Sequence, residues 1–321
     1  MYMFKYICKR VGLMLLTFAI IFTVCFVLIK LLPVDTSTVG VGQDADKLKA
    51  QLAARGYDKP IMEQFGLYIR RIVLEGDFGI GVNMPEYRGM NVWDVFVEKL
   101  PPTILINIYS SLIAVPLGIA LGILAALKKN KWQDHLISTA VMVFISVPSF
   151  VYASLLLYVV CFKLNWFPMI MNAGFDYFTW DMFKSMMPAV ISMSFGSIAG
   201  YARFTRAELT EVLTGEYMLL ARTKGLTKAQ ATTRHALRNA MVPIFPSIIG
   251  EFISVMSGSL IIEKIFAIPG VGGLYLTAIN SKDYDFFMML SGFYLLIGLA
   301  AALVIDLSYG VIDPRIRMGA K

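Results

Sequence analysis

Charged residues are scarce in this chain. Asp, Glu, Lys and Arg make up 16% of the 321 residues, whereas hydrophobic residues make up 57%. Soluble globular domains are typically about 25% charged and about 45–50% apolar. Long apolar runs also recur along the whole length, so composition excludes an ordinary soluble domain. It predicts an all-α polytopic membrane protein instead.

Cysteine and histidine are too few to build a metal site or a disulfide framework. The three cysteines are Cys8, Cys25 and Cys161, and the two histidines are His135 and His235. No spacing among them matches a metal-ligand pattern. Because the cysteines are odd in number and two lie in apolar runs, we expect free thiols and no metal.

Sequence signs of catalysis and of nucleotide binding are missing too. The chain contains no G-x-x-x-x-G-K-[ST] motif, so we expect no phosphate-binding loop and no ATP hydrolysis by this polypeptide. The Gly-rich turn at 269–273 does not have dinucleotide-binding spacing. No Ser/His, paired Asp or His-rich constellation falls at a common membrane depth, which argues against an intramembrane enzyme. We therefore expect a non-catalytic chain without a cofactor of its own.

The apolar runs predict six transmembrane helices. They cover about 11–32, 103–127, 135–161, 186–204, 244–262 and 286–306. If the N-terminus is cytoplasmic, the inner loops carry a clear excess of Lys and Arg, while the outer loops are slightly acidic. This predicts a multi-pass protein of the cell membrane with both termini in the cytoplasm. The net charge of +7 is then a topology signal, and a nucleic-acid partner is not needed to explain it.

The long segment 33–102 is predicted to form a small extracellular helical cap. Gly56 and Pro60 separate two stretches with helical apolar spacing. The residues that show this spacing are Leu48, Leu52, Phe65, Tyr68, Ile69 and Ile72. Shielding of the bundle ends and contact with a substrate or partner are both open roles for this cap.

The loop between the fourth and fifth apolar runs, 205–243, is the most informative stretch. Its first predicted helix has one face made by Tyr217, Leu220, Ala221 and Lys224. Gly225 follows at the position of a left-handed stop, with apolar Leu226 next, as in a Schellman motif.

A second helix is predicted to follow directly. Thr227 and Gln230 have the spacing of a capping box. The helix carries the positively charged side chains of this loop and is expected to end near Pro243. Two helices set at an angle by one glycine would form a rigid elbow. A basic loop lying on the membrane surface is the alternative.

This stretch resembles the EAA loop of ATP-binding-cassette (ABC) importer permeases, in the oligopeptide/dipeptide/nickel branch. Leu219 and Leu220 depart from the broader motif, as is common in the peptide branch. In that family the loop contains a coupling helix that docks on the ATPase subunit. The resemblance implies coupling residues at Glu216, Tyr217, Ala221, Lys224, Gly225, Leu226, His235, Arg238, Asn239 and Pro243.

The resemblance extends along nearly the whole chain. LPPTILINIYSSLIAVPLGIALGILAALKKNKWQDHLIS resembles the family's second span, and YARFTRAELTEVL the approach to the loop. GDFG fits the outer loop, and DLSYGVIDPRIR resembles the end of the first, B-type oligopeptide permease subunit. EKIFAIPGVGGL resembles the outer turn, whose residues are Glu263, Pro269, Gly270 and Gly272. The chain departs from the family at KLLPVDTST and at Asp285, where a proline is common.

The resemblance implies a fold similar to type I ABC importers, with residues 1–321 forming a single permease domain. It also implies three kinds of protein partner: a second homologous permease subunit, two ABC ATPase subunits that bind ATP and Mg, and an extracellular substrate-binding protein. The expected function is peptide import. Import of nickel or another small solute, and a gradient-driven secondary transporter, are the alternatives.

One carboxylate falls inside an expected span. Glu251 should face the bundle interior, water or a cation, because a charge at mid-membrane costs roughly 2.5–3.5 kcal/mol on insertion scales. It is either a translocation-path residue that meets the peptide or a hydrogen-bonded packing residue. Met256, Ser257 and Ser259 would suit the same path, although residues of these types more often serve plain packing.

Overall fold

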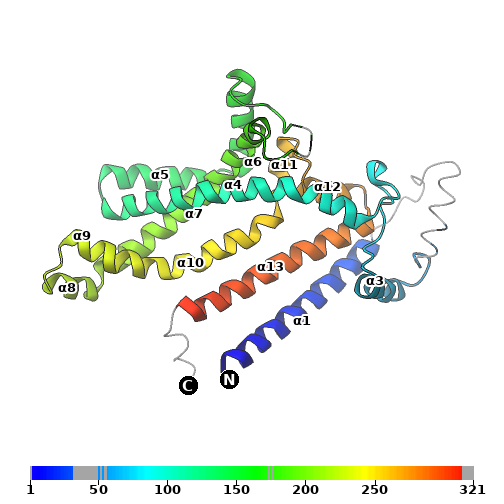
Figure 1. Cartoon of the computed structure of the whole chain (residues 1–321), viewed down its shortest axis with the longest axis horizontal. Coiled ribbons are helices and arrows are strands. Elements are labelled where there is room, and N and C mark those ends of the chain that lie inside the picture. The colour runs from blue at the N-terminus through cyan, green and yellow to red at the C-terminus, as the bar shows by residue number, and fades with distance from the viewer. Residues whose placement is uncertain are drawn as a thin grey trace. The chain divides into compact units, whose positions relative to one another are not determined.

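The computed structural model describes residues 2–31, 50, 53, 56–172, 174 and 176–312, and the elements in this part are mainly helices (Figure 1). The chain divides into two compact units. The first unit comprises residues 1–103, 257–260 and 269–300, and the second comprises 104–256, 261–268 and 301–321. Each unit is described by itself below.

The first core of this unit lies between α1, α3 and the start of α13. The elements of this unit are α1 (Tyr2–Leu31), α3 (Ile61–Glu75), η2 (Pro85–Tyr87), the first turns of α4 (Val92–Leu127), α12 (Val271–Asn280) and most of α13 (Tyr284–Ile312). Phe22 and Phe26 of α1 pack on Tyr68 of α3 and Met288 of α13. Figure 1 shows α1 running alongside this part of α13. The face of α3 that the sequence predicted to be apolar is therefore the face that packs.

Helix α3 begins where the sequence predicted, and its end is set by a glycine. It starts directly after Pro60, and it stops at Gly76, whose φ of 65° places it in the left-handed region that terminates helices. The first predicted helix of the cap, with Leu48 and Leu52, lies outside the described residues.

Helix α4 begins earlier than expected. Residues up to 102 were assigned to the loop, but the helix starts at Val92, because the Asn91 side chain accepts a hydrogen bond from the backbone N–H of Trp93 at 2.8 Å. Phe96 on these first turns packs with Val271 and Phe286 in a second core of the first unit.

The second unit is built around α7. Its elements are the rest of α4, α5 (Trp132–Ser146), α6 (Ser149–Leu156), η3 (Leu157–Lys163), α7 (Trp180–Thr214), α8 (Glu216–Thr223), α9 (Lys228–Ala231), η4 (Thr232–Ala236), α10 (Leu237–Ser254) and most of α11 (Leu260–Ile265). Helix α4 approaches α7 closely at Gly118 and Gly122. A Cβ on Gly122 would lie 2.7 Å from the Ala202 carbonyl oxygen, so only glycine permits this contact.

The expected span 135–161 is not one straight helix. Helices α5 and α6 meet at an angle of 100°. The break falls at Val147 and Pro148, because proline cannot donate to the helical ladder and disfavours helical geometry at the residue before it.

Four of the described helices are long and apolar enough to cross a membrane, and the bent pair α5 and α6 makes a fifth candidate. Helix α7, expected to cross at 186–204, is not among them. Its middle carries Ser192, Ser194 and Gly196, which lower its hydropathy. Ser192 and Ser194 are buried within the second unit, so this stretch needs less apolar surface than a lipid-facing helix.

The expected span 244–262 is interrupted. Helix α10 ends at Ser254, and a 3₁₀ turn, η5 (Val255–Ser257), follows. Gly258 then has a φ of 65°, which breaks the helix before α11 begins at Leu260.

Candidate functional site

The first arm of the 205–243 loop ends in the predicted Schellman motif. In α8 the N–H of Leu226 donates to the Ala221 carbonyl oxygen at 3.3 Å, and the N–H of Gly225 donates to that of Arg222 at 3.0 Å. Gly225 has a φ of 88°, which a residue with a side chain rarely adopts. Glu216 lies in the first turn of α8, where its charge favours the positive end of the helix dipole.

The second arm begins with the predicted capping box. The backbone N–H of Gln230 donates to Thr227 Oγ1 at 3.3 Å, and the N–H of Thr227 donates to Gln230 Oε1 at 3.1 Å. Only one residue, Leu226, separates the stop at Gly225 from this cap. The turn between the two arms is therefore fixed by hydrogen bonds on both sides.

The prediction that the second arm ends near Pro243 is wrong. The helix runs without a break over Lys228–Ser257 and carries Pro243 and Pro246 inside it. Each proline removes one hydrogen bond, but the burial of Ala240 and Ile244 maintains the helix past them. A π-helical segment, η4, lies within this run at Thr232–Ala236.

Small side chains hold the two arms together. Ala221 of α8, Ala231 of α9 and Ala240 of α10 are buried in one cluster with Leu209 of α7 and Ala126 of α4. In Figure 1, α8 and α9 lie together at one end of α10. Alanine lets these backbones approach closely, so the two arms pack against each other and against α7.

The outer face of this elbow is exposed and of mixed character. Leu219 and Leu220 of α8 are 65% and 56% exposed. The expected residues Lys224, His235, Arg238 and Asn239 are exposed as well, whereas Leu226 and Pro243 are half-buried. The Tyr217 side chain lies outside the described residues. Two exposed leucines beside positive charges form a surface suited to contact with another protein.

A buried ion pair braces α5 against α7 close to the elbow. Arg206 donates from Nε to Asp134 Oδ1 at 2.5 Å and from a second nitrogen to Oδ2 at 2.9 Å. Asp134 is 2% exposed and also accepts from the Asn130 N–H at 2.9 Å. Arg206 lies in the stretch YARFTRAELTEVL noted in the sequence, but its pairing with Asp134 was missed, because the two residues are far apart in the chain.

Glu251 on α10 lies against α7. Ser197 Oγ donates to Glu251 Oε1 at 3.0 Å, and the Tyr201 hydroxyl donates to the Ser247 carbonyl oxygen at 3.1 Å. Glu251 is half-buried. Both readings of Glu251, path and packing, are compatible with this geometry.

Met256, Ser257 and Ser259 lie at the break between α10 and α11 and not inside a regular helix. All three are half-buried. The backbone turns at Gly258 between the two serines. The structure thus groups three of the expected path residues at an irregular point of the chain.

Comparison with known proteins identifies the family. Residues 118–318 match the family described as binding-protein-dependent transport system inner membrane component, and residues 3–107 match its N-terminal counterpart. The chain belongs to this permease family. The dipeptide transport system permease protein DppB of Lactococcus lactis is 33% identical over 98% of this chain and 100% of its own length.

A further relative agrees with this membership, and two solved structures share the fold. The glutathione transport system permease protein GsiC of Escherichia coli is 33% identical over 98% of this permease and 99% of its own length. A solved amino acid ABC transporter has a TM-score of 0.53 at 19% identity, covering 68% of this chain and 94% of its own. A solved methionine ABC transporter has a TM-score of 0.51 at 15% identity, covering 67% of this chain and 97% of its own. The permease is therefore a multi-pass protein of the cell membrane with an ABC-transporter fold.

The outer turn of the permease caps α12. Gly270 is the N-cap residue, and the N–H of Val271 donates to Thr103 Oγ1 at 2.9 Å. Gly272 is buried inside the helix, and Pro269 is exposed. Glu263, on α11, is almost fully buried.

Two aspartates at the start of α13 hold the outer loop of the permease. Asp283 Oδ2 accepts from the N–H groups of Val82 and Asn83, both at 2.7 Å, and from that of Met84 at 3.3 Å. Burial raises the pKa of the Asp283 carboxyl, and these N–H donors oppose that rise. Successive N–H groups around one carboxylate form an anion-binding nest.

The second of these aspartates explains a departure from the family pattern. Asp285 accepts hydrogen bonds from the Tyr57 hydroxyl and from the Ile80 N–H, the latter at 3.0 Å. A Cβ on Gly79 would lie 2.0 Å from Asp285 Oδ2, so the second glycine of GDFG makes room for this carboxylate. Where a proline is common, this permease has a residue that binds its outer loop.

Proposed function

We propose that this chain is the membrane-spanning permease subunit of an ATP-driven importer that translocates peptides. The observation that carries the coupling role is the elbow at 216–243, which is fixed by hydrogen bonds at its turn and continues unbroken into the Lys228–Ser257 helix. The peptide cargo is supported by the relatives named for dipeptide and glutathione transport.

The proposed topology has six spans with both termini in the cytoplasm. Helix α7 is the sixth span beside the four apolar helices and the bent pair. In this arrangement the segment 33–102, with α3, forms the extracellular cap, and the basic 205–243 loop faces the cytoplasm.

The energy would come from other polypeptides. The complex would contain a second homologous permease subunit, two ABC ATPases that bind ATP and Mg, and an extracellular substrate-binding protein that delivers the peptide. The exposed leucines and basic residues of α8 would contact the ATPase. The permease itself contributes no nucleotide-binding motif and no catalytic residue.

ATP binding would be coupled to transport through the stiffness of the elbow. Closure of the ATPases on ATP would displace α8, and the alanine-packed core would transmit that displacement to α9 and α10 without a flexible joint. The continuous helix would then move Glu251, which we assign to the translocation path beside the α10–α11 break. Alternating access of the bundle would follow from this motion.

The test is ATP-dependent uptake in proteoliposomes that contain this chain, its permease partner, both ATPases and the binding protein. Uptake of a labelled peptide is measured for the wild type and for Gly225→Pro. Proline cannot adopt the φ of 88° and loses the N–H that donates to Arg222, so uptake should fall by at least tenfold while the complex still assembles.

Gly225→Asn is the matched control, since asparagine tolerates the left-handed conformation and keeps its N–H. It should retain most of the uptake. Uptake that proceeds without ATPases, or that Gly225→Pro leaves unchanged in an assembled complex, would reject the coupling role and favour a gradient-driven carrier.

A further inference from the structure

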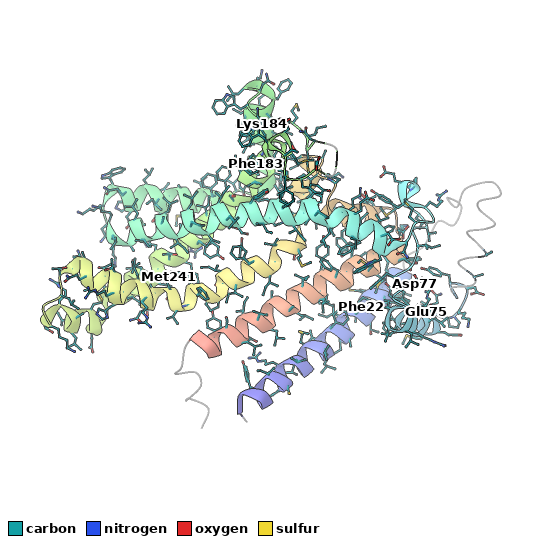
Figure 2. The ribbon with its side chains drawn as sticks, viewed as in Figure 1. Phe22, Glu75, Asp77, Phe183, Lys184 and Met241 are labelled. Atoms are coloured by element: carbon teal, nitrogen blue, oxygen red, sulfur yellow. The ribbon has the colours of Figure 1, made fainter. Side chains whose placement is uncertain are left out.

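A small polar cavity lies inside the first unit, away from the elbow and the proposed path. It has a volume of about 10 Å³, which is about the room that one water-sized occupant needs. Its polar lining comes from α1, from the segment 57–71 and from the start of α13. The lining residues that matter are Lys30, Tyr57, Gln64, Tyr68, Arg71 and Asp285. In Figure 2 the labels of Phe22 on α1 and Asp77 just after α3 mark this part of the unit.

Four buried polar atoms of this lining have no hydrogen-bond partner in the described part of the chain. They are Arg71 Nε, Arg71 Nη1, the Tyr68 hydroxyl and Gln64 Oε1. Tyr68 is only 3% exposed. Leaving a buried polar atom unpaired is unfavourable, and more so for a charged group. Three of the four atoms are hydrogen-bond donors.

The charges of the cavity do not balance. Among the described lining residues, Lys30 and Arg71 are two cations and Asp285 is the one carboxylate. Asp285 already accepts from Tyr57 and from the Ile80 N–H. Lys30 Nζ lies 3.9 Å from the centre of the Tyr57 ring, a cation–π contact that does not cancel its charge.

The tyrosines of the lining cannot supply the missing negative charge. Burial raises the pKa of the Tyr57 and Tyr68 hydroxyls well above the usual value, so both stay protonated. The Tyr68 hydroxyl is therefore a donor toward the cavity. An excess positive charge in a buried site is unfavourable unless a counter-ion occupies it.

We propose that this cavity binds a monatomic anion of the chloride class, held by Arg71 Nε and Nη1 and by the Tyr68 hydroxyl. Lys30 supplies a second positive charge beside it. A water molecule would satisfy the same donors and also Gln64 Oε1, but it would leave the charge uncancelled. The anion connects α3 to α1 and α13, and so fastens the outer segment to two membrane helices.

The first test compares the unfolding midpoint of the full-length chain in detergent in sodium chloride and in sodium gluconate at equal ionic strength. Saturating chloride should raise the midpoint by about 3 °C, because it binds the folded state alone. Arg71→Gln should abolish this difference. Arg70→Gln, an exposed neighbour on the same helix, should keep it. A wild-type midpoint that is the same in both salts would overturn the proposal.

A second measurement does not depend on how the variants fold. Crystals of the wild type grown in bromide should show an anomalous peak in the cavity. Density for an ordered water without that peak would mean that the site holds water only. Neither measurement needs the ATPases or transport, so the outcome is independent of the proposed importer function.

Discussion

The ion pair between Asp134 and Arg206 shows how this chain stabilises a buried charge between two packed helices. Asp134 receives four hydrogen bonds, two of them from the guanidinium of Arg206 and the others from the Asn130 N–H and from the Ser138 hydroxyl at 3.3 Å. A carboxylate satisfied in this way is stable inside a helix bundle, whereas the same carboxylate alone would not be. The pair matters because α7 leads directly into the elbow.

Replacing Arg206 by methionine should therefore destabilise the protein. The change leaves the buried Asp134 carboxylate without its charged partner, which costs about 3–5 kcal/mol for fully buried pairs. Because the Arg206 side chain is 34% exposed, we expect a smaller loss, of about 2 kcal/mol. The measurement is the free energy of unfolding by denaturant in detergent micelles.

The double variant Asp134→Leu with Arg206→Met is the control for this prediction. It removes both charges, so it should be more stable than Arg206→Met alone. If the two variants were equally unstable, the loss would come from packing and the ion-pair explanation would fail.

At the scale of elements, the contact between α4 and α7 depends on two glycines four residues apart. A Cβ on Gly118 would lie 2.8 Å from the Ile198 carbonyl oxygen, and one on Gly122 would lie 2.6 Å from Thr205 Cβ. Neither backbone can move away without opening the bundle. Small residues at this spacing are a common means of close helix packing in membranes.

Gly122→Ala should consequently cost about 1–3 kcal/mol of stability through overpacking. Gly200→Ala, on α7 with nothing within 4 Å of its Cβ, should be neutral or slightly stabilising. Thermal unfolding of both variants in the same detergent gives the comparison. Equal midpoints for the two would contradict the close approach at Gly122.

The sequence correctly predicted the helix ends that are determined by neighbouring residues. The stop at Gly225 and the cap at Thr227 are each determined by residues within about four positions, so the pattern suffices to predict them. The start of α3 after Pro60 is a similar case. These features need no knowledge of the rest of the fold.

The elements that were missed depend on tertiary packing. Pro243 looks like a helix end in sequence, yet the helix continues because its buried face packs on α7. Pro148 looks no different in sequence, and there the chain bends by 100°. The pairing of Asp134 with Arg206, and of Asp283 with the N–H groups of the outer loop, joins residues too distant for any spacing rule.

At the scale of the whole molecule, the six-span topology can be tested by cysteine labelling in intact cells. In a chain whose native cysteines are replaced by serine, Asp58→Cys should react with a membrane-impermeant maleimide, because Asp58 is exposed within the proposed cap. A chain that keeps only the exposed Cys8 should react after the cells are opened and not before. Labelling of Cys8 in intact cells would reverse the orientation.

The unbroken helix from Lys228 to Ser257 has a geometric consequence. Its 30 residues span about 45 Å at 1.5 Å per residue, which exceeds the thickness of the hydrocarbon core. If this helix pivots as a lever arm at its capped end, a tilt of about 10° displaces the far end by about 8 Å, because that end moves by the arm length times the sine of the tilt. The far end is the irregular turn at Gly258. A small tilt imposed at the cytoplasmic end of the helix would therefore displace this turn by about the width of a side chain.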